Sequence, residues 1–222
     1  MSILRVITVS LIATFALGAV NLPNPATDEK KPEAKSEVAV FAGGCFWGVE
    51  AVFDAVKGVT EAASGYAGGS KNNAHYEIVS TGTTGHAESV QINFDPSQIS
   101  YGQLLKIYFS VVHDPTELNR QGPDEGTQYR SQIFYTSEEQ KRVAEAYIQQ
   151  LTAAKVFRKP IVTKVVPLQA FYQAEAYHQD YVLHCQQGLA VCTNKRYVDY
   201  NDVPKVAALH QEFPALLKGG KQ

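Results

Sequence analysis

Sulfur is scarce in this sequence of 222 residues, which contains three cysteines and one methionine. The cysteines, Cys45, Cys185 and Cys192, allow one disulfide and leave one thiol over, and a leftover thiol in an oxidising compartment needs an explanation. The methionine is Met1, so a chain processed at its N-terminus would contain none. That would suit a protein that works among oxidants, although chance explains it equally well.

Charge of one sign is also lacking, because 20 Lys and Arg residues balance 22 Asp and Glu residues and give a formal net charge of -2. No basic stripe is available for a phosphate backbone, so nucleic acid is not an expected partner. The histidines show no recognised metal-ligand spacing, so we predict no metal site. A hydrophobic content of 45% with 10% aromatics instead indicates one globular domain with a packed core.

Long hydrophobic runs are absent except at the N-terminus. Arg5 precedes an apolar run from Val6 to Val20, which has the length of a signal-peptide core and is short for a membrane span. Residues 1–20 are therefore predicted to be a signal peptide, with the small residues Ala16 and Gly18 before the cleavage site. An uncleaved membrane anchor would show much the same pattern. We expect an exported protein, periplasmic or secreted.

The next segment, residues 21–36, is rich in Pro, Lys, Glu and Asp and has almost no large apolar residue. This composition is typical of a flexible, solvated tether. From Glu37 onward, apolar residues recur with the periods of strands and helices. We therefore expect a single catalytic domain over residues 37–222.

Strands and helices alternate in the predicted order. The expected strands are residues 38–42, 59–66, 89–94, 131–135 and 161–166, and the expected helices are 45–56, 100–112, 137–154 and 168–183. Two helices begin with a capping-box pattern, Ser100 with Gln103 and Ser137 with Gln140. The first six elements follow the β-α-β-β-α-β order of ferredoxin-like folds. The predicted fold class is an α/β (α+β) sandwich with a mixed sheet, to which a C-terminal helix, strand and helix are appended.

The surroundings of Cys45 favour a reactive thiol. Gly43 and Gly44 precede it at the junction of a strand and a helix, where free backbone N–H groups and the helix dipole favour negative charge and would lower the thiol pKa. Trp47 could form the aromatic floor of a small apolar pocket. The alternative is an inert cysteine and a tryptophan that are simply packed in the core.

The residues around Cys45 also resemble a known family. The run Gly-Cys-Phe-Trp-Gly at residues 44–48 is similar to the signature of the peptide methionine sulfoxide reductases that act on the S epimer of the sulfoxide. Further segments resemble that family in the same order, and they are residues 64–69 (SGYAGG), 85–88 (GHAE), 124–131 (DEGTQYRS) and 176–181 (AYHQDY). The resemblance covers most of the chain from Glu37.

This resemblance implies a repair enzyme that reduces methionine sulfoxide through a cysteine sulfenic acid. Cys45 would be the nucleophile and Glu88, if burial keeps it protonated, the acid that supplies a proton to the oxygen. Tyr66 and Tyr129 resemble the phenols that bind this oxygen. Without the resemblance, the glutamate would be interpreted as solvated and the tyrosines as packed.

Substrate-binding residues follow from the same resemblance. Phe46 and Trp47 would enclose the S-methyl group, and Asp124 resembles a polar residue of the pocket, although beside Pro123 it also fits a turn. No organic cofactor is implied. His178 is expected to be structural, with a supporting role left open.

The other two cysteines have two interpretations. Cys185 or Cys192 could attack the oxidised Cys45 and transfer the disulfide to a thioredoxin-like donor. The segment between them lacks the glycine-rich pattern of relatives with resolving cysteines, so a structural Cys185–Cys192 disulfide is the alternative.

A reactive Cys45 is also compatible with other functions. A peroxidase or a cysteine peptidase could use Cys45, and a non-catalytic module could bind oxidised peptides in an aromatic pocket. The retained Cys45 and Glu88, together with the ordered motifs, favour the reductase, with oxidised proteins or peptides as substrates.

Overall fold

The computed structural model describes residues 22–28 and 35–219. Its centre is an antiparallel sheet of four strands, β1 (Glu37–Ala42), β2 (Val59–Ala67), β3 (Ala87–Phe94) and β6 (Gln132–Tyr135). These strands lie in the order β6-β1-β3-β2, and the ferredoxin-like core predicted from the sequence is confirmed. At one edge β7 (Lys164–Pro167) runs parallel to β6, and at the other β8 (Phe171–Gln173) runs antiparallel to β2. The sheet is therefore mixed, as expected.

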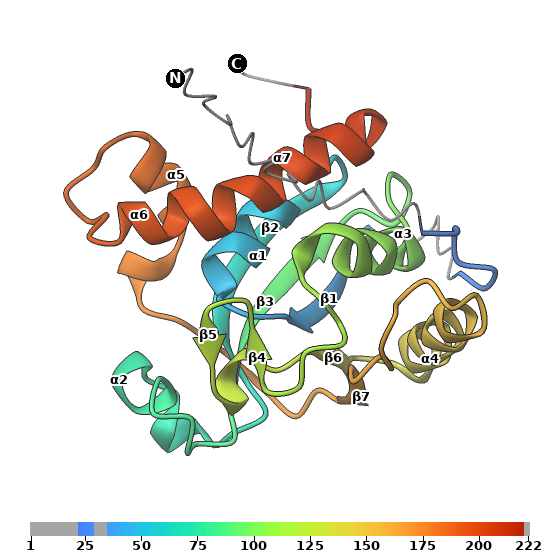
Figure 1. Cartoon of the computed structure of the whole chain (residues 1–222), viewed down its shortest axis with the longest axis horizontal. Helices are drawn as coiled ribbons and strands as arrows, with labels where there is room; N and C mark the ends of the chain where they lie inside the picture. Colours follow the sequence, from blue (N-terminus) through green and yellow to red (C-terminus); the bar gives the residue numbers. More distant parts are fainter. Residues whose placement is uncertain (1–21, 29–34, 220–222) are drawn as a thin grey trace, which may run out of the picture.

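Two helices lie in the crossover connections of this core. Helix α1 (Phe46–Asp54) connects β1 to β2, and α3 (Tyr101–Ile107) continues into a π-helical turn (Tyr108–Val112) before β6. The main hydrophobic core lies between these helices and the sheet (Figure 1). Helix α4 (Glu138–Ala153) packs beside α3 and against β6 and β7.

The two predicted capping boxes have different outcomes. At α3 the box is complete, because the Ser100 hydroxyl accepts from the Gln103 N–H and the Gln103 side chain accepts from the Ser100 N–H. At α4 only the Ser137 half forms. The Gln140 side chain instead bonds to Thr136 and to the Val38 carbonyl, so it ties α4 to β1.

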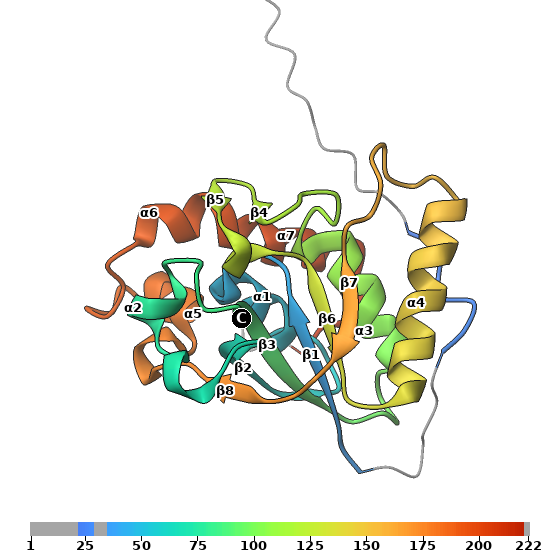
Figure 2. The ribbon, with the colours of Figure 1, turned by 90° about the horizontal axis from the view of Figure 1, so that it is seen from below.

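The face of the sheet opposite α1 and α3 is covered by a later segment of the chain. Val40, Ala42 and Phe134 are buried there under Leu168 and Phe171. Leu168 begins the connection from β7 to β8 and Phe171 is the first residue of β8. This connection crosses from one edge of the sheet to the other in Figure 2.

The predicted helix at residues 168–183 is wrong except at its end, because the α-helix begins only at Tyr181. The chain forms β8, a 3-10 turn (Ala176–His178) and the short helix α5 (Tyr181–Gln186). Glycine at position 65 explains the strand, because a Cβ there would lie 2.3 Å from the Phe171 ring and 2.5 Å from the Tyr172 carbonyl oxygen. The missing side chain lets β8 approach the edge of β2.

Several short elements and one helix were not predicted. The helix is α7 (Val203–Glu212), which packs on α1 (Figure 1). The short elements are α2 (Tyr76–Val79), β4 (Arg120–Gln121), β5 (Asp124–Glu125), α6 (Lys195–Tyr197), a π-helical turn (Val198–Asp202) and 3-10 turns at Lys71–Asn73, Thr127–Tyr129 and Pro214–Leu216. Most of them surround the first turn of α1.

Part of the flexible tether expected over residues 21–36 is described in the structure, and this part is packed rather than solvated. Residues 22–28 pack on α3 and α4, with Leu22 1% exposed and the Tyr147 hydroxyl donating to the Pro23 carbonyl. Asp28 accepts from the Gly102 N–H and the Ser100 hydroxyl at the start of α3. The few apolar groups and backbone acceptors of this segment thus suffice to dock it. The predicted signal peptide at 1–20 lies outside the described residues, and no helix among the described residues is long and apolar enough to cross a membrane.

Candidate functional site

Cys45 lies where the chain turns from β1 into α1. It is the N-cap residue of α1, and Gly44 before it has a φ of 94°, in the left-handed region that glycine adopts without strain. A Cβ at Gly43 would lie 3.0 Å from the His113 ring. The Cys45 side chain is 7% exposed and is a free thiol.

Glu88 lies beside this thiol on the second position of β3. Its side chain is 2% exposed, and its Oε2 accepts a hydrogen bond of 3.0 Å from the Phe46 N–H at the start of α1. Burial raises the pKa of Glu88 to about 8, against the opposing effect of that N–H. The carboxyl group is therefore protonated near neutral pH and can donate a proton.

The pKa of the Cys45 thiol differs from the expectation. Burial raises it well above its ordinary value, and negative charge on Glu88 or Asp202 raises it further. The Trp47 N–H in the first turn does lower it, as expected of a helix N-terminus, but this effect is smaller than desolvation. The lowered thiol pKa is thus a wrong prediction for the resting site.

A small pocket of about 170 Å³ opens at Cys45 and Glu88. Of the residues expected in the site, Phe46, Trp47, Asp124 and Tyr129 also line it. The structure adds three residues that the sequence analysis missed, which are Tyr76, Asn194 and Tyr197. These three come from α2 and the C-terminal segment.

The sequence contains only weak signals for Tyr76 and Tyr197. Tyr76 is the one aromatic residue between Gly68 and Ala87, in a stretch that otherwise has the composition of a polar loop. Tyr197 lies in the C-terminal segment, and its hydroxyl donates to Asp124. Neither carries a spacing that points to Cys45.

The phenols divide into two groups. Tyr76 and Tyr129 face the pocket, and neither hydroxyl has a hydrogen-bond partner among the described residues. Burial raises the pKa of both, that of Tyr76 to about 12, so both keep their protons. Tyr66 does not line the pocket, and its hydroxyl donates to Glu175 at 2.8 Å. Because Glu175 also accepts from the Tyr76 N–H at 3.0 Å, Tyr66 helps to position Tyr76.

The Trp47 ring is fixed from several sides. It stacks on Tyr181 with ring centroids 3.8 Å apart, and its Nε1 donates to His178 Nδ1 at 3.0 Å. Burial lowers the pKa of His178 to about 4, so the imidazole is neutral and can accept this bond. His178 supports the pocket floor from behind.

The remaining cysteines are joined in a Cys185–Cys192 disulfide with a Cα–Cα distance of 4.9 Å. Cys185 at the end of α5 is 0% exposed, and Cys192 is partly exposed. The same helix carries Tyr181, whose ring stacks on Trp47, so α5 packs close to the first turn of α1.

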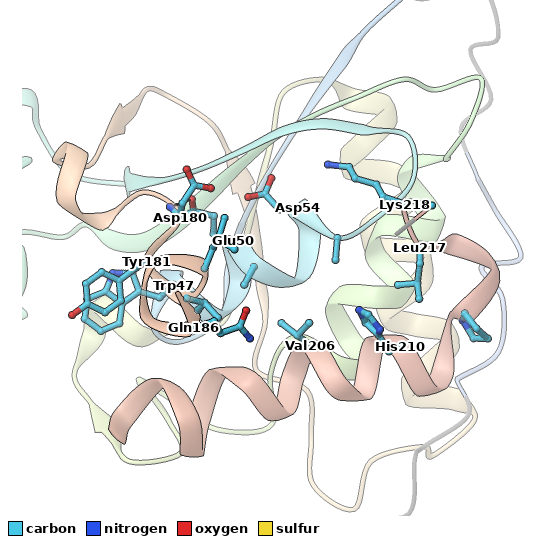
Figure 3. Close-up of a pocket in the computed structure, with 16 residues that line it drawn as sticks. Trp47, Glu50, Asp54, Asp180, Tyr181, Gln186, Val206, His210, Leu217 and Lys218 are labelled. Carbon is cyan, nitrogen blue, oxygen red and sulfur yellow. Dashed lines mark hydrogen bonds between the residues drawn. The ribbon is translucent and has the colours of Figure 1, made fainter. Parts of the chain in front are cut away.

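Trp47 also lines a larger hollow of about 700 Å³ between α1, α5 and α7 (Figure 3). Ligand atoms of Glu50, Asp54 and Asp180 lie there within 4.8 Å of one another. The Glu50 oxygens already accept from the Ser64 hydroxyl and the Asp180 N–H. The residues that line this hollow include no cysteine, serine or threonine, and the absence of a metal in the function stays a prediction.

Fold and site together define a class of protein, a cysteine-dependent oxidoreductase on a ferredoxin-like core. A family model described as peptide methionine sulfoxide reductase matches residues 37–210. This chain belongs to that family.

Relatives and solved structures agree with this assignment. The chain is 56% identical over 188 residues to peptide methionine sulfoxide reductase MsrA 2 of Mesorhizobium japonicum, covering 85% of this chain and 93% of that one. It is 48% identical over 182 residues to MsrA of Thermus thermophilus, covering 82% and 98%. The reduced form of Mxr1 from Saccharomyces cerevisiae has a similar structure, with a TM-score of 0.62 and 33% identity over 75% of this chain and 94% of that one.

Proposed function

We propose that this protein reduces the S epimer of methionine sulfoxide in oxidised proteins and peptides, with Cys45 as nucleophile. The observation that carries the proposal is the pairing of a buried thiol with a protonated carboxyl group at the start of one helix. The epimer follows from the family resemblance, and the pocket of about 170 Å³ suits a group no larger than the end of a methionine side chain.

The first step transfers oxygen to the cysteine. The Cys45 thiolate attacks the sulfoxide sulfur while Glu88 supplies a proton to the oxygen. This attack forms a transient bond between the Cys45 Sγ and the substrate sulfur. The protonated oxygen then passes to Cys45 Sγ while the S–O bond of the substrate and the transient sulfur–sulfur bond break, which leaves a Cys45 sulfenic acid and methionine as the thioether. Tyr76 and Tyr129 are placed to donate hydrogen bonds to the oxygen as negative charge develops.

Phe46 and Trp47 hold the substrate in this step. Their rings lie 6.3 Å apart beside the thiol and suit the apolar S-methyl group. Asp124, held by the Tyr197 hydroxyl, gives the pocket a polar side for the backbone or the oxygen of the substrate.

The cycle closes by thiol exchange. In the reduced protein, Cys185 condenses with the Cys45 sulfenic acid, which releases water and forms a Cys45–Cys185 disulfide. Cys192 then attacks Cys185 and frees Cys45, which leaves the disulfide pair present in the structure. A thioredoxin-like dithiol reduces this pair at Cys192, because it is the more exposed sulfur.

A single turnover without reductant tests the proposal. Fully reduced protein is mixed with one equivalent of a methionine sulfoxide peptide, and methionine and free thiols are counted. We expect one methionine formed for two thiols lost, and no methionine from Cys45→Ser. Unchanged thiols in the wild-type protein would contradict the function.

We also propose that the protein is exported by residues 1–20. The composition of this segment supports the proposal, and fractionation of cells with N-terminal sequencing tests it. Protein that keeps Met1 and stays in the cytosolic fraction would contradict it.

A further inference from the structure

A second carboxylate reaches the reactive helix from the C-terminal part of the chain. Asp202 ends the π-helical turn that continues into α7, and its own backbone angles are helical. Its side chain accepts no hydrogen bond from the first N–H groups of α7. The carboxylate instead turns to α1, where a Cβ added at Gly48 would lie 2.3 Å from Asp202 Oδ1.

Gly48 and Cys45 lie on one face of the first turn of α1, because helical residues three apart are neighbours. The carboxylate packed on Gly48 therefore lies alongside the thiol. Asp202 is 0% exposed, and neither oxygen has a hydrogen-bond partner among the described residues. A buried carboxylate without donors is unfavourable unless an opposite charge compensates it.

Lys205 supplies this charge from the first turn of α7. Its Nζ lies 3.7 Å from Asp202 Oδ1, and its side chain is 17% exposed. Its Cδ would lie 3.1 Å from a Cβ at Gly48, so the lysine side chain passes the same point of α1 as the carboxylate. The absence of a side chain at position 48 thus brings both charges to the start of the reactive helix.

We propose that Asp202 and Lys205 form an electrostatic pair of the reactive site, in which Lys205 stabilises negative charge on the Cys45 sulfur and Asp202 holds the ammonium group in place. Both are positioning residues. The inference rests on the proposed function only in taking Cys45 as the nucleophile.

The two charges act on the thiol in opposite directions. Lys205 lowers the pKa of Cys45 and Asp202 raises it. Lys205 also lowers the pKa of Glu88 and Asp124, so one ammonium group serves three acids of the site. The other ionisable groups that face the sulfur are Glu88 on β3, Asp124 on β5, Tyr76 on α2, Tyr129 before β6 and Tyr197 on α6.

Alkylation of Cys45 by iodoacetamide tests the pair. With the Cys185–Cys192 disulfide intact, Cys45 is the one free thiol among the three cysteines, and its thiolate displaces iodide from the reagent. Below the thiol pKa the rate follows the thiolate fraction. We expect Lys205→Met to slow alkylation at pH 7.5 by about three- to tenfold and Asp202→Asn to accelerate it by a similar factor.

Further variants separate charge from packing. The double variant Asp202→Asn with Lys205→Met should lie within about twofold of wild type, because the removed charges cancel. Lys205→Arg should retain the wild-type rate. Matched controls are Lys195→Met and Asp199→Asn, which break an exposed pair on the preceding helix, where solvent screens the charge, and these should change nothing.

The directions in which the two single variants change the alkylation rate decide the outcome. Single variants that change the rate in the same direction, or leave it unchanged, would overturn the pair, since loss of packing has no reason to act with opposite signs. If Lys205→Met does not fold, Asp202→Asn alone decides, by accelerating or failing to accelerate. Alkylation needs no sulfoxide, so it tests the pair separately from the proposed function. Variants that show these changes in alkylation rate, in a protein that has no reductase activity, would contradict the proposed function and still support the pair of Asp202 and Lys205.

Discussion

At the scale of single residues, the chemistry depends on which of two buried acids keeps its proton. Burial raises the pKa of both Glu88 and Cys45, that of Glu88 to about 8 and that of the thiol well above its usual value. Both are therefore protonated in the resting site near neutral pH. The reactive form, thiolate with carboxylic acid, has lost one proton in total, which couples the two titrations.

This coupling fixes the expected pH dependence. Below pH 8 the reactive form becomes more abundant as pH rises, and above about 8 it levels out, because the proton lost first comes mainly from Glu88. We expect kcat/KM with dithiothreitol to rise and then level near pH 8, and Glu88→Gln to lose about a hundredfold or more. A wild-type profile that falls through pH 8 would show that the thiol ionises first.

The phenols give a second prediction at this scale. Tyr76→Phe and Tyr129→Phe each remove a donor that faces the pocket, so each should lower kcat/KM by about tenfold, and both together by about a hundredfold. Tyr66→Phe is the matched control, because it loses only the bond to Glu175. It should lower the free energy of unfolding by about 1 kcal/mol and lower kcat/KM much less than Tyr76→Phe does, because Glu175 keeps its bond to the Tyr76 N–H. Equal losses of activity in Tyr66→Phe and Tyr76→Phe would contradict this division.

At the scale of elements, local patterns predict the core and long-range contacts decide the rest. The strands of the central sheet and the box at Ser100 follow from apolar periodicity and capping residues near in sequence. Strand β8 forms because Gly65, more than a hundred residues away, admits Phe171 at the sheet edge. No local pattern in residues 168–183 contains that information.

The docked N-terminal segment gives a prediction for elements. Leu22→Ala should lower the free energy of unfolding by about 2 kcal/mol, because the side chain is buried on the core. Asp28→Ala should lower it by about 1 kcal/mol, because it removes the acceptors at the start of α3. Urea unfolding measures both, with Thr27→Ala as the control. Variants as stable as wild type would show that the segment is a solvated tether after all.

At the scale of the whole molecule, the site collects residues from both ends of the domain. The family motifs predict Cys45, Glu88, Asp124 and Tyr129, and the fold brings them to one pocket. Tyr197 and Asp202 could not be predicted, because they reach the site only when the helical segment from α6 to α7 packs on α1. The raised thiol pKa is likewise a property of the assembled site, since it comes from burial that no single segment provides.

The disulfide relay is a prediction at this scale as well. Cys192→Ser should stop after one turnover with Cys45 and Cys185 crosslinked, because the second exchange has no attacking thiol. Peptide mapping by mass spectrometry without reductant shows the crosslink. The absence of any Cys45–Cys185 crosslink in the variant would contradict this order of exchange.

The central claim is that Cys45 reduces one epimer of methionine sulfoxide in this pocket. The most direct measurement is the reduction of each epimer of a methionine sulfoxide peptide, with dithiothreitol as donor, by the wild-type protein and by Cys45→Ser. We expect turnover of the S epimer by the wild-type protein and none by the variant. Turnover of neither epimer, or equal turnover by both proteins, would contradict the claim.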